Sequence, residues 1–251
     1  MSNSFYQQQL KSKSREYLRA NAKASGFILK EKSPSCGLEQ CKYYLPAKEK
    51  LQGRTAGILP REIKKHFIHS FIITEEGLTD SRALYYFLLK VFTWQRWLEV
   101  KNNFSIARLQ KFQAYHKLLF LGFNRQIVDQ MGKLIAQQKK YSPAVIINRF
   151  EDLLLRIFQF NLSRPRWNNV ILHGFGHLSD YLSAKSKENF LNKLAKFREG
   201  KLNFWPLHHW LADRAAQYEV NYLTQQFFLF PYPREINLAL EQINKLPDPF
   251  A

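Results

Sequence analysis

The sequence predicts an α+β protein that is mostly α, with an incomplete α/β layer of a few short strands followed by an all-α helical part. Three observations support this prediction. Apolar residues recur at helical spacing over most of the 251 residues. Short apolar runs typical of buried strands occur only in the first 100 or so residues. The chain has only 10 glycines and 10 prolines, and 45% of its residues are hydrophobic, so long regular elements can form a substantial core.

The first part of the chain alternates helical and strand-like segments. Helices are expected over residues 5–24 and 62–68, and a long helix is expected after a cap at Asp80 or Ser81. Strands are expected at 27–30, 42–45 and 71–73, with a surface loop at 47–59. This alternation indicates an α/β layer over residues 1–101.

Strand signals stop after this point, and Ser105 is the expected cap of the next helix. Helical spacing is found at 105–122, 124–138, 143–161, 167–183, 185–199, 204–217 and 234–245. The clearest segment is 143–161, where Pro143 stands at a helix start. Residues 102–251 are therefore expected to form an all-helical domain.

The chain is strongly basic, with 38 Lys and Arg against 20 Asp and Glu and a net charge of +18. Such an excess fits a polyanionic partner, with nucleic acid ahead of a membrane surface. A basic surface that only keeps the protein in solution is the alternative. There is no apolar run of about 18–20 residues for a membrane span and no signal-peptide core near Met1. With two cysteines, this pattern favours a cytoplasmic, reducing location.

A thiol is expected on a tight loop at the end of the first strand, in Ser33-Pro34-Ser35-Cys36-Gly37. Pro34 favours a turn there, and Gly37 permits a backbone angle that other residues avoid. A metal or iron–sulfur site needs three or four ligands. Cys41, His66 and His69 could complete a zinc set with Cys36, although their spacing is not specific. A Cys36–Cys41 disulfide is a further alternative, which so sparse a cysteine pattern supports little.

Two histidines, His173 and His177, lie one turn apart on a predicted helix. This spacing can hold a metal ion. Gly174 and Gly176 favour a close helix contact instead, so two packed histidines are the preferred interpretation.

Basic and aromatic residues are interleaved in several segments. Arg164, Arg166, Trp167 and Asn169 are expected on a loop between helices, where such side chains can hold phosphates, stack on a base and read base edges. Tyr115-His116-Lys117 and Lys139-Lys140-Tyr141 repeat the mixture. Each segment alone is better explained as a solvated loop with a core aromatic. Together, on a chain of charge +18, they make RNA binding the leading functional prediction.

Two long stretches resemble known domains. Residues 16–98 are similar to the later part of the thiouracil desulfurase domain, through Gly26-Phe27-Ile28-Leu29-Lys30, Lys32-Ser33-Pro34-Ser35-Cys36-Gly37-Leu38, Glu75-Glu76-Gly77, Asp80, Val91-Phe92 and Arg96-Trp97. Residues 105–240 resemble the YbgA-like helical domain, through His116-Lys117-Leu118-Leu119, Asn169-Val170-Ile171-Leu172-His173, Gly176, Tyr222-Leu223, Gln226, Pro231-Tyr232-Pro233 and Glu235. The two domains occur fused in this order in bacterial tRNA 4-thiouridine desulfidases.

The resemblance implies a chemistry for that family. Three cysteines hold a [4Fe–4S] cluster, and its open iron takes the sulfur from the thiocarbonyl. Cys36 corresponds to one of these ligands, while Ser33 and Ser35 sit where the loop borders the substrate. The other two ligands lie upstream in relatives, and Cys41 falls where relatives usually carry an aliphatic residue. We therefore expect a tRNA-binding protein with impaired catalysis and no cluster on this chain.

Two alternatives stay open. A second chain or an N-terminal extension could complete the cluster and give an active desulfurase, or the chain could be a non-functional remnant. The helical part also departs from the family pattern, with His177, Ser179 and Ala239 where relatives carry an aromatic, a lysine and an arginine. The residues predicted to contact RNA are His116, Lys117, Arg164, Arg166, Trp167 and Asn169.

Overall fold

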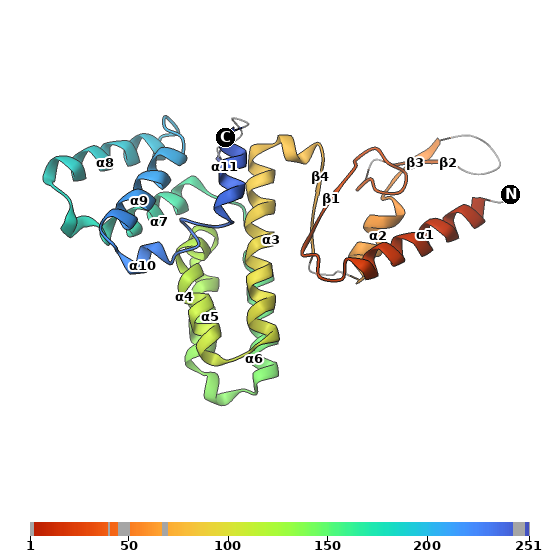
Figure 1. The fold of residues 1–251 in the computed structure, drawn as a ribbon, viewed down its shortest axis with the longest axis horizontal. Coiled ribbons are helices and arrows are strands. Elements are labelled where there is room, and N and C mark those ends of the chain that lie inside the picture. The colour runs from red at the N-terminus through yellow and green to blue at the C-terminus, as the bar shows by residue number, and fades with distance from the viewer. Residues whose placement is uncertain (1–2, 40, 45–50, 67–69, 243–248, 251) are drawn as a thin grey trace. The chain divides into compact units, whose positions relative to one another are not determined.

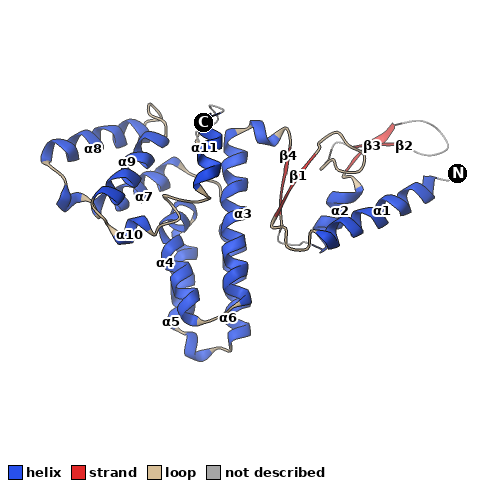
Figure 2. Cartoon of the chain, viewed as in Figure 1, coloured by secondary structure: helices blue, strands red, loops and turns tan. Residues whose placement is uncertain are grey.

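The structure, a computed structural model, describes residues 3–39, 41–44, 51–66, 70–242 and 249–250. Helices predominate and the few strands are short, which confirms the predicted fold class (Figure 2). The elements in chain order are α1 (Asn3–Ala20), β1 (Gly26–Leu29), β2 (Cys41–Tyr44), β3 (Leu51–Thr55), α2 (Ile58–His66), β4 (Phe71–Thr74), η1 (Gly77–Thr79), α3 (Ser81–Asn102), α4 (Ile106–Phe123), α5 (Arg125–Ala136), η2 (Gln138–Lys140), α6 (Pro143–Ile157), α7 (Arg164–Gly176), η3 (Ser179–Tyr181), α8 (Ala184–Arg198), α9 (Trp205–Gln217), α10 (Asn221–Thr224) and α11 (Arg234–Gln242).

The chain divides into two compact units, residues 1–91 and 92–251. The division falls inside α3, whereas the sequence suggested a boundary near residue 101, at the end of this helix. α3 runs through the division as one helix of 22 residues. The two units therefore share an element, and the sequence-based domain boundary stays a prediction.

The first unit contains two small sheets. β1 pairs with β4 in parallel, with Gly26 opposite Phe71, and β2 pairs with β3 antiparallel, with Cys41 opposite Thr55. The strands expected near 27–30, 42–45 and 71–73 are confirmed. The expected surface loop at 47–59 is wrong in part, because β3 lies within it; residues 45–50 lie outside the described part. Leu51–Thr55 shows no apolar alternation, so its strand depends on pairing with β2 rather than on its own pattern.

A small apolar core holds α1, β1 and α2 together. Leu18, Phe27, Leu29 and Ile63 are almost completely buried in it. The Nε of Arg15 in α1 also donates a hydrogen bond of 2.7 Å to the carboxylate of buried Glu62 in α2. An ion pair thus reinforces the apolar contact between these two helices.

The second unit is helical in all its described elements. α4 packs against α5 and α7, and α5 packs against α6. Helices α7 to α10 lie together on one side of α4 (Figure 1). Side-chain caps explain where several helices begin: Ser105 accepts a hydrogen bond from the Arg108 amide, as expected, and Asn124 accepts one from Ile127.

Aromatic side chains form much of the core of the second unit. Trp97 stacks on Phe150 with ring centroids 5.1 Å apart. Trp167 contacts the rings of Phe204 and Phe228 at 5.1 and 5.2 Å. No helix in the described ranges is both long and apolar enough to cross a membrane.

Candidate nucleic-acid interface

The loop that carries Cys36 follows β1 and is held by its own backbone. The amides of Cys36 and Gly37 donate to the carbonyl oxygen of Ser33 at 3.2 and 2.7 Å. The hydroxyl oxygens of Ser33 and Ser35 lie 3.0 Å apart, and Ser35 Oγ lies 3.4 Å from Cys36 Sγ. The three predicted residues Ser33, Ser35 and Cys36 therefore share one turn, and their catalytic and ligand roles stay predictions.

Gly37 is required in this loop for a reason other than the expected one. Its φ is not positive. A Cβ at this position would instead lie 2.1 Å from the carbonyl oxygen of Glu31 and 2.4 Å from Cys41 Sγ. The loop is also tied to the start of α2, since the Gly57 amide donates to the Gly37 carbonyl oxygen at 2.8 Å. Close packing on three sides explains the glycine.

The donors near Cys36 do not fit the [4Fe–4S] cluster that the resemblance implies. Such a cluster takes three or four cysteine ligands, and this chain has two cysteines. Both are free thiols, so the alternative of a Cys36–Cys41 disulfide is wrong. The buried Cys41 thiol already donates to the Ser33 carbonyl oxygen at 2.9 Å. Within the described ranges, no three His, Cys, Asp or Glu side chains come together to hold a metal ion, and His69 lies outside these ranges.

The segment predicted to be an RNA-binding loop is the first part of α7. Pro165 stands in the first turn of this helix, where its missing N–H is no loss. Arg164 donates to the carbonyl oxygens of Phe197, Leu202 and Phe250, and Arg166 donates to those of Gly122 and Asn161. The two guanidinium groups thus tie helices and chain segments together. The prediction that they lie on an open loop is wrong.

Trp167 is completely buried, which corrects its expected role as a base-stacking side chain. Its indole lies over Gly122 of α4, where a Cβ would be 2.8 Å from Nε1. Among the four residues of this segment predicted to contact RNA, Asn169 is exposed and the two arginines are half-buried. Trp167 therefore serves the contact between α4 and α7.

His116 is also fully buried, so the prediction that it contacts RNA directly does not agree with the structure. Its ring packs against Phe112, Phe120 and Phe227. His116 Nδ1 lies 2.8 Å from the carbonyl oxygen of Phe112, which requires a proton on Nδ1. Burial, helped by the nearby Arg96 and opposed by the hydrogen bond to Phe112, lowers the pKa of His116 to about 3, so the imidazole is neutral at pH 7.

A buried glutamine joins the segment after α10 to α4. Gln226 Nε2 donates to the carbonyl oxygen of Ala114 at 3.0 Å, and its Oε1 accepts from the amide of Leu118 at 3.1 Å. In a regular helix these two backbone groups would bond to each other. The adjacent Phe227 amide donates to the Tyr115 carbonyl oxygen at 2.9 Å. This insertion fixes the segment from Tyr222 to Phe227 against α4.

Four side chains come near one another at the surface beside this joint, and we name them the Lys–His–Tyr cluster: Lys117 of α4, His173 of α7, His177 just after α7, and Tyr222 of α10. The rings of His173 and His177 have centroids 5.2 Å apart, and those of His177 and Tyr222 are 4.3 Å apart. Lys117, His173 and His177 are exposed and Tyr222 is half-buried. The expectation that the two histidines are packed in a helix contact is therefore wrong, since both reach solvent.

The cluster presents hydrogen-bond donors and positive charge. The pKa of His177 is lowered by partial burial, then by His173 and by Lys117. Burial raises the pKa of Tyr222, which keeps its phenol protonated. Nearby, the guanidinium of Arg96 lies 3.7 Å from the ring centroid of Phe227, and burial lowers its pKa to about 10, so it remains charged at pH 7. The positive charge of Lys117 opposes a metal ion at the histidine pair and favours an anion.

Among the residues predicted to contact RNA, only Lys117 belongs to this cluster. His173, His177 and Tyr222 were not assigned to RNA. A signal existed for the histidines, because their spacing of four places them on one face of a helix. None existed for Tyr222, whose place depends on the tertiary contact that Gln226 makes.

Comparison with known proteins adds a family match for the helical unit. No curated protein and no solved structure is significantly similar to the chain. Residues 117–233 match a family described as "Protein of unknown function (DUF1722)". This range includes the whole Lys–His–Tyr cluster and lies inside the stretch that resembles the YbgA-like domain. Residues 117–233 of this chain thus form a region similar to the DUF1722 family.

Proposed function

We propose that this chain binds folded RNA and that the Lys–His–Tyr cluster holds phosphate groups of that RNA. The resemblance to tRNA 4-thiouridine desulfidases makes tRNA the RNA to test first. The observation that carries the proposal is the meeting of an ammonium group, two imidazoles and a phenol, from three helices, on one surface. Most hydrogen bonds between proteins and nucleic acids go to phosphate and sugar groups, and such groups supply them.

The charge of the chain supports the same proposal. Residues 101–251 carry 21 Lys and Arg against 11 Asp and Glu. An excess of this size attracts a polyanion over distances longer than a single contact. The cluster then provides close contacts at one place on this surface.

No desulfurase step is part of the proposal. Such a step would require a cluster that the two cysteines do not fit. Cys36 is treated as a residue of the loop after β1, and its replacement is expected to leave RNA binding unchanged.

Fluorescence anisotropy with labelled tRNA tests the proposal. The logarithm of the affinity should fall linearly with the logarithm of the salt concentration, by about 0.7–0.9 for each phosphate contact. Lys117→Gln should weaken binding and reduce this slope by about one contact. Lys193→Gln, which removes the same charge from the exposed face of α8, is the matched control. Cys36→Ala should bind as the parent chain does.

The histidines add a dependence on pH. A bound phosphate favours protonated imidazole, and the pKa of His177 is lowered in the unbound chain, so tRNA should bind more tightly as the pH falls below neutrality. The double variant His173→Gln/His177→Gln should lose most of this increase, whereas His209→Gln, at an exposed histidine of α9, should keep it. Absent or salt-insensitive binding would refute the proposal, as would equal effects of Lys117→Gln and Lys193→Gln.

A further inference from the structure

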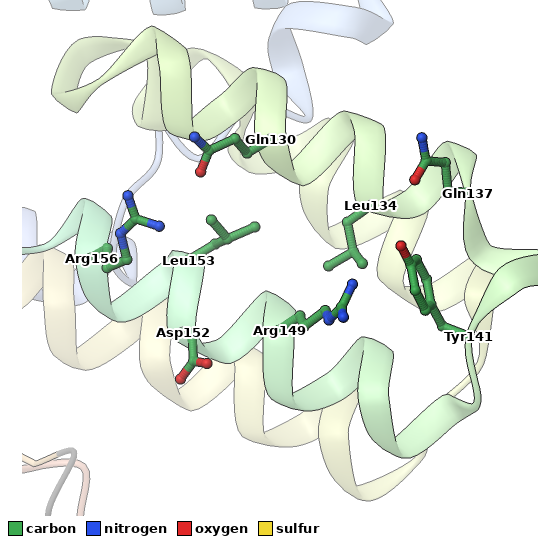
Figure 3. A pocket seen from close by; sticks show the side chains of 8 residues that line it. All are labelled: Gln130, Leu134, Gln137, Tyr141, Arg149, Asp152, Leu153 and Arg156. Carbon is green, nitrogen blue, oxygen red and sulfur yellow. The ribbon is translucent and has the colours of Figure 1, made fainter.

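A pocket of about 350 Å³ opens between α5 and α6 (Figure 3). None of its lining residues belongs to the Lys–His–Tyr cluster. Leu134 of α5 and Leu153 of α6 extend into the gap between the helices from opposite sides. Tyr141, just after η2, stands at one end. The complete lining is Gln130, Leu134, Gln137, Tyr141, Arg149, Asp152, Leu153 and Arg156.

Most polar side chains of this pocket form no hydrogen bond or ion pair with another described residue. The guanidinium carbon of Arg149 lies 4.4 Å from the ring centroid of Tyr141. The side chains of Gln130, Gln137 and Arg156 form no hydrogen bond or ion pair with any other residue in the described ranges. Two amides and two guanidinium groups therefore keep their hydrogen-bonding capacity for a ligand.

The spacing of the two arginines excludes a small ligand that would engage both. Arg149 and Arg156 are separated by two turns of α6, about 10 Å along the helix axis. A single phosphate cannot span this distance, whereas a nucleotide carries its base and its phosphate at opposite ends. Asp152 is the one carboxylate in the lining, and in Figure 3 its side chain points away from α5.

The two ends of the pocket offer different chemistry. The stacked Arg149–Tyr141 pair provides planar groups of the kind on which unpaired bases stack. Leu134 and Leu153 provide an apolar surface between the ends, and the glutamine amides can pair with base edges. Arg156 provides a positive charge at the other end. A volume of about 350 Å³ lies in the range of small-molecule sites.

We propose that this pocket takes one unpaired nucleotide of the bound RNA, with the base beside Arg149 and Tyr141 and the phosphate at Arg156. The inference rests on the proposed RNA binding and adds a preference for RNA that offers an unstacked nucleotide. Lys139 and Lys140 lie on η2 beside the pocket but do not line it. They provide charge next to the site without forming it.

Lys139 and Lys140 supply a matched control, because they lie beside the pocket without lining it. Anisotropy would compare an RNA stem-loop with a blunt RNA duplex of the same stem, for Arg149→Gln/Arg156→Gln and for Lys139→Gln/Lys140→Gln. Both variants lose two charges on the same part of the surface. The pocket variant should lose about tenfold more affinity for the stem-loop than the control variant, a loss in the range of one stacked base. For the duplex the two variants should be equal.

A second measurement needs no RNA polymer. Uridine monophosphate at millimolar concentration should shift the methyl NMR signals of Leu134 and Leu153 in the full chain, and inorganic phosphate should not. Equal losses of stem-loop affinity in both variants, or no methyl shifts with uridine monophosphate, would overturn the pocket. If the parent chain binds neither RNA, the proposed function fails, and the nucleotide titration alone decides the pocket.

Discussion

The indole of Trp97 donates a hydrogen bond of 2.7 Å to the carboxylate of Glu151, and this pair joins α3 to α6 inside the second unit. Lys101 Nζ lies 3.1 and 2.8 Å from the two oxygens of the same carboxylate. Glu151 is buried, so its charge is stabilised by these two donors rather than by water. The contact between α3 and α6 at Trp97 therefore depends on the carboxylate of Glu151.

Glu151→Ala should therefore destabilise the second unit by about 2–4 kcal/mol, because it leaves the Trp97 N–H and the Lys101 ammonium without their acceptor. Urea unfolding followed by tryptophan fluorescence measures this unit, since all five tryptophans lie in it. Asp152→Ala, at the next and exposed residue of the same helix, is the control and should change stability by less than about 0.5 kcal/mol. Equal losses in the two variants would contradict the prediction.

Gln226→Leu should cost about 2–3 kcal/mol, because the buried Leu118 amide and the part-buried Ala114 carbonyl lose their partner. Gln225→Leu applies the same change to the exposed neighbour and should cost little. Gln226→Leu should also weaken tRNA binding, because the segment that carries Tyr222 is no longer held against α4. A variant as stable as the parent would show that the helix closes its own hydrogen bond.

Two glycines of neighbouring helices should respond to alanine in opposite ways. Gly122→Ala places a Cβ 2.8 Å from Trp167 Nε1, and the overpacking should cost about 1–3 kcal/mol. Gly132→Ala in α5 meets only the end of Gln113 at 4.0 Å and should gain about 0.5–1 kcal/mol from helix propensity. The shift of the urea midpoint at constant m-value gives both numbers. A gain at both positions would show that the Trp167 indole can move aside.

Acid should weaken the first unit through Glu62. The hydrogen bond from Arg15 is the largest cause that lowers the pKa of this carboxyl below its ordinary value of 4.5. A lowered folded-state pKa means that the pair stabilises the fold above about pH 4.5, and that this contribution is lost as the pH falls through the folded-state value. The protection factors of the α2 amides, which correct hydrogen exchange for its intrinsic dependence on pH, should fall over this interval in the parent chain.

In Glu62→Gln, the protection factors of the α2 amides should already be lower at pH 7 and should fall little further in acid. Glu16→Gln removes the exposed carboxylate that pairs with Lys13 and serves as the control. Identical pH profiles for the parent and Glu62→Gln would contradict the role of this pair.

Periodicity predicted the helices well because most of them are amphipathic in isolation. Residues 143–161 and 185–199 were expected to be helical, and α6 and α8 lie there. Local chemistry also predicted the Ser105 cap. Elements that depend on a partner were missed: β3 exists through pairing with β2, and α10 is a single turn held by its tertiary contacts.

The candidate site was predicted less well, because composition does not show which side of a helix is buried. Arg164 and Trp167 look like nucleic-acid contacts in the sequence, yet both serve the core. One signal was available for His116, which lies four residues from both Phe112 and Phe120 and so shares their buried face. The position of Tyr222 could not be predicted, since it follows from the long-range bonds of Gln226.

The contacts of Phe250 carry a consequence for biosynthesis. Its ring lies 5.6 Å from that of Trp167, and its carbonyl oxygen accepts a hydrogen bond from Arg164, 86 residues earlier. At about 5–20 residues per second, a ribosome needs roughly 4–17 s to make this interval. Until Phe250 is made, the Trp167 indole lacks this one ring contact, although Phe204 and Phe228 can already pack against it, and this incomplete shielding makes the half-made helical unit a substrate for chaperones.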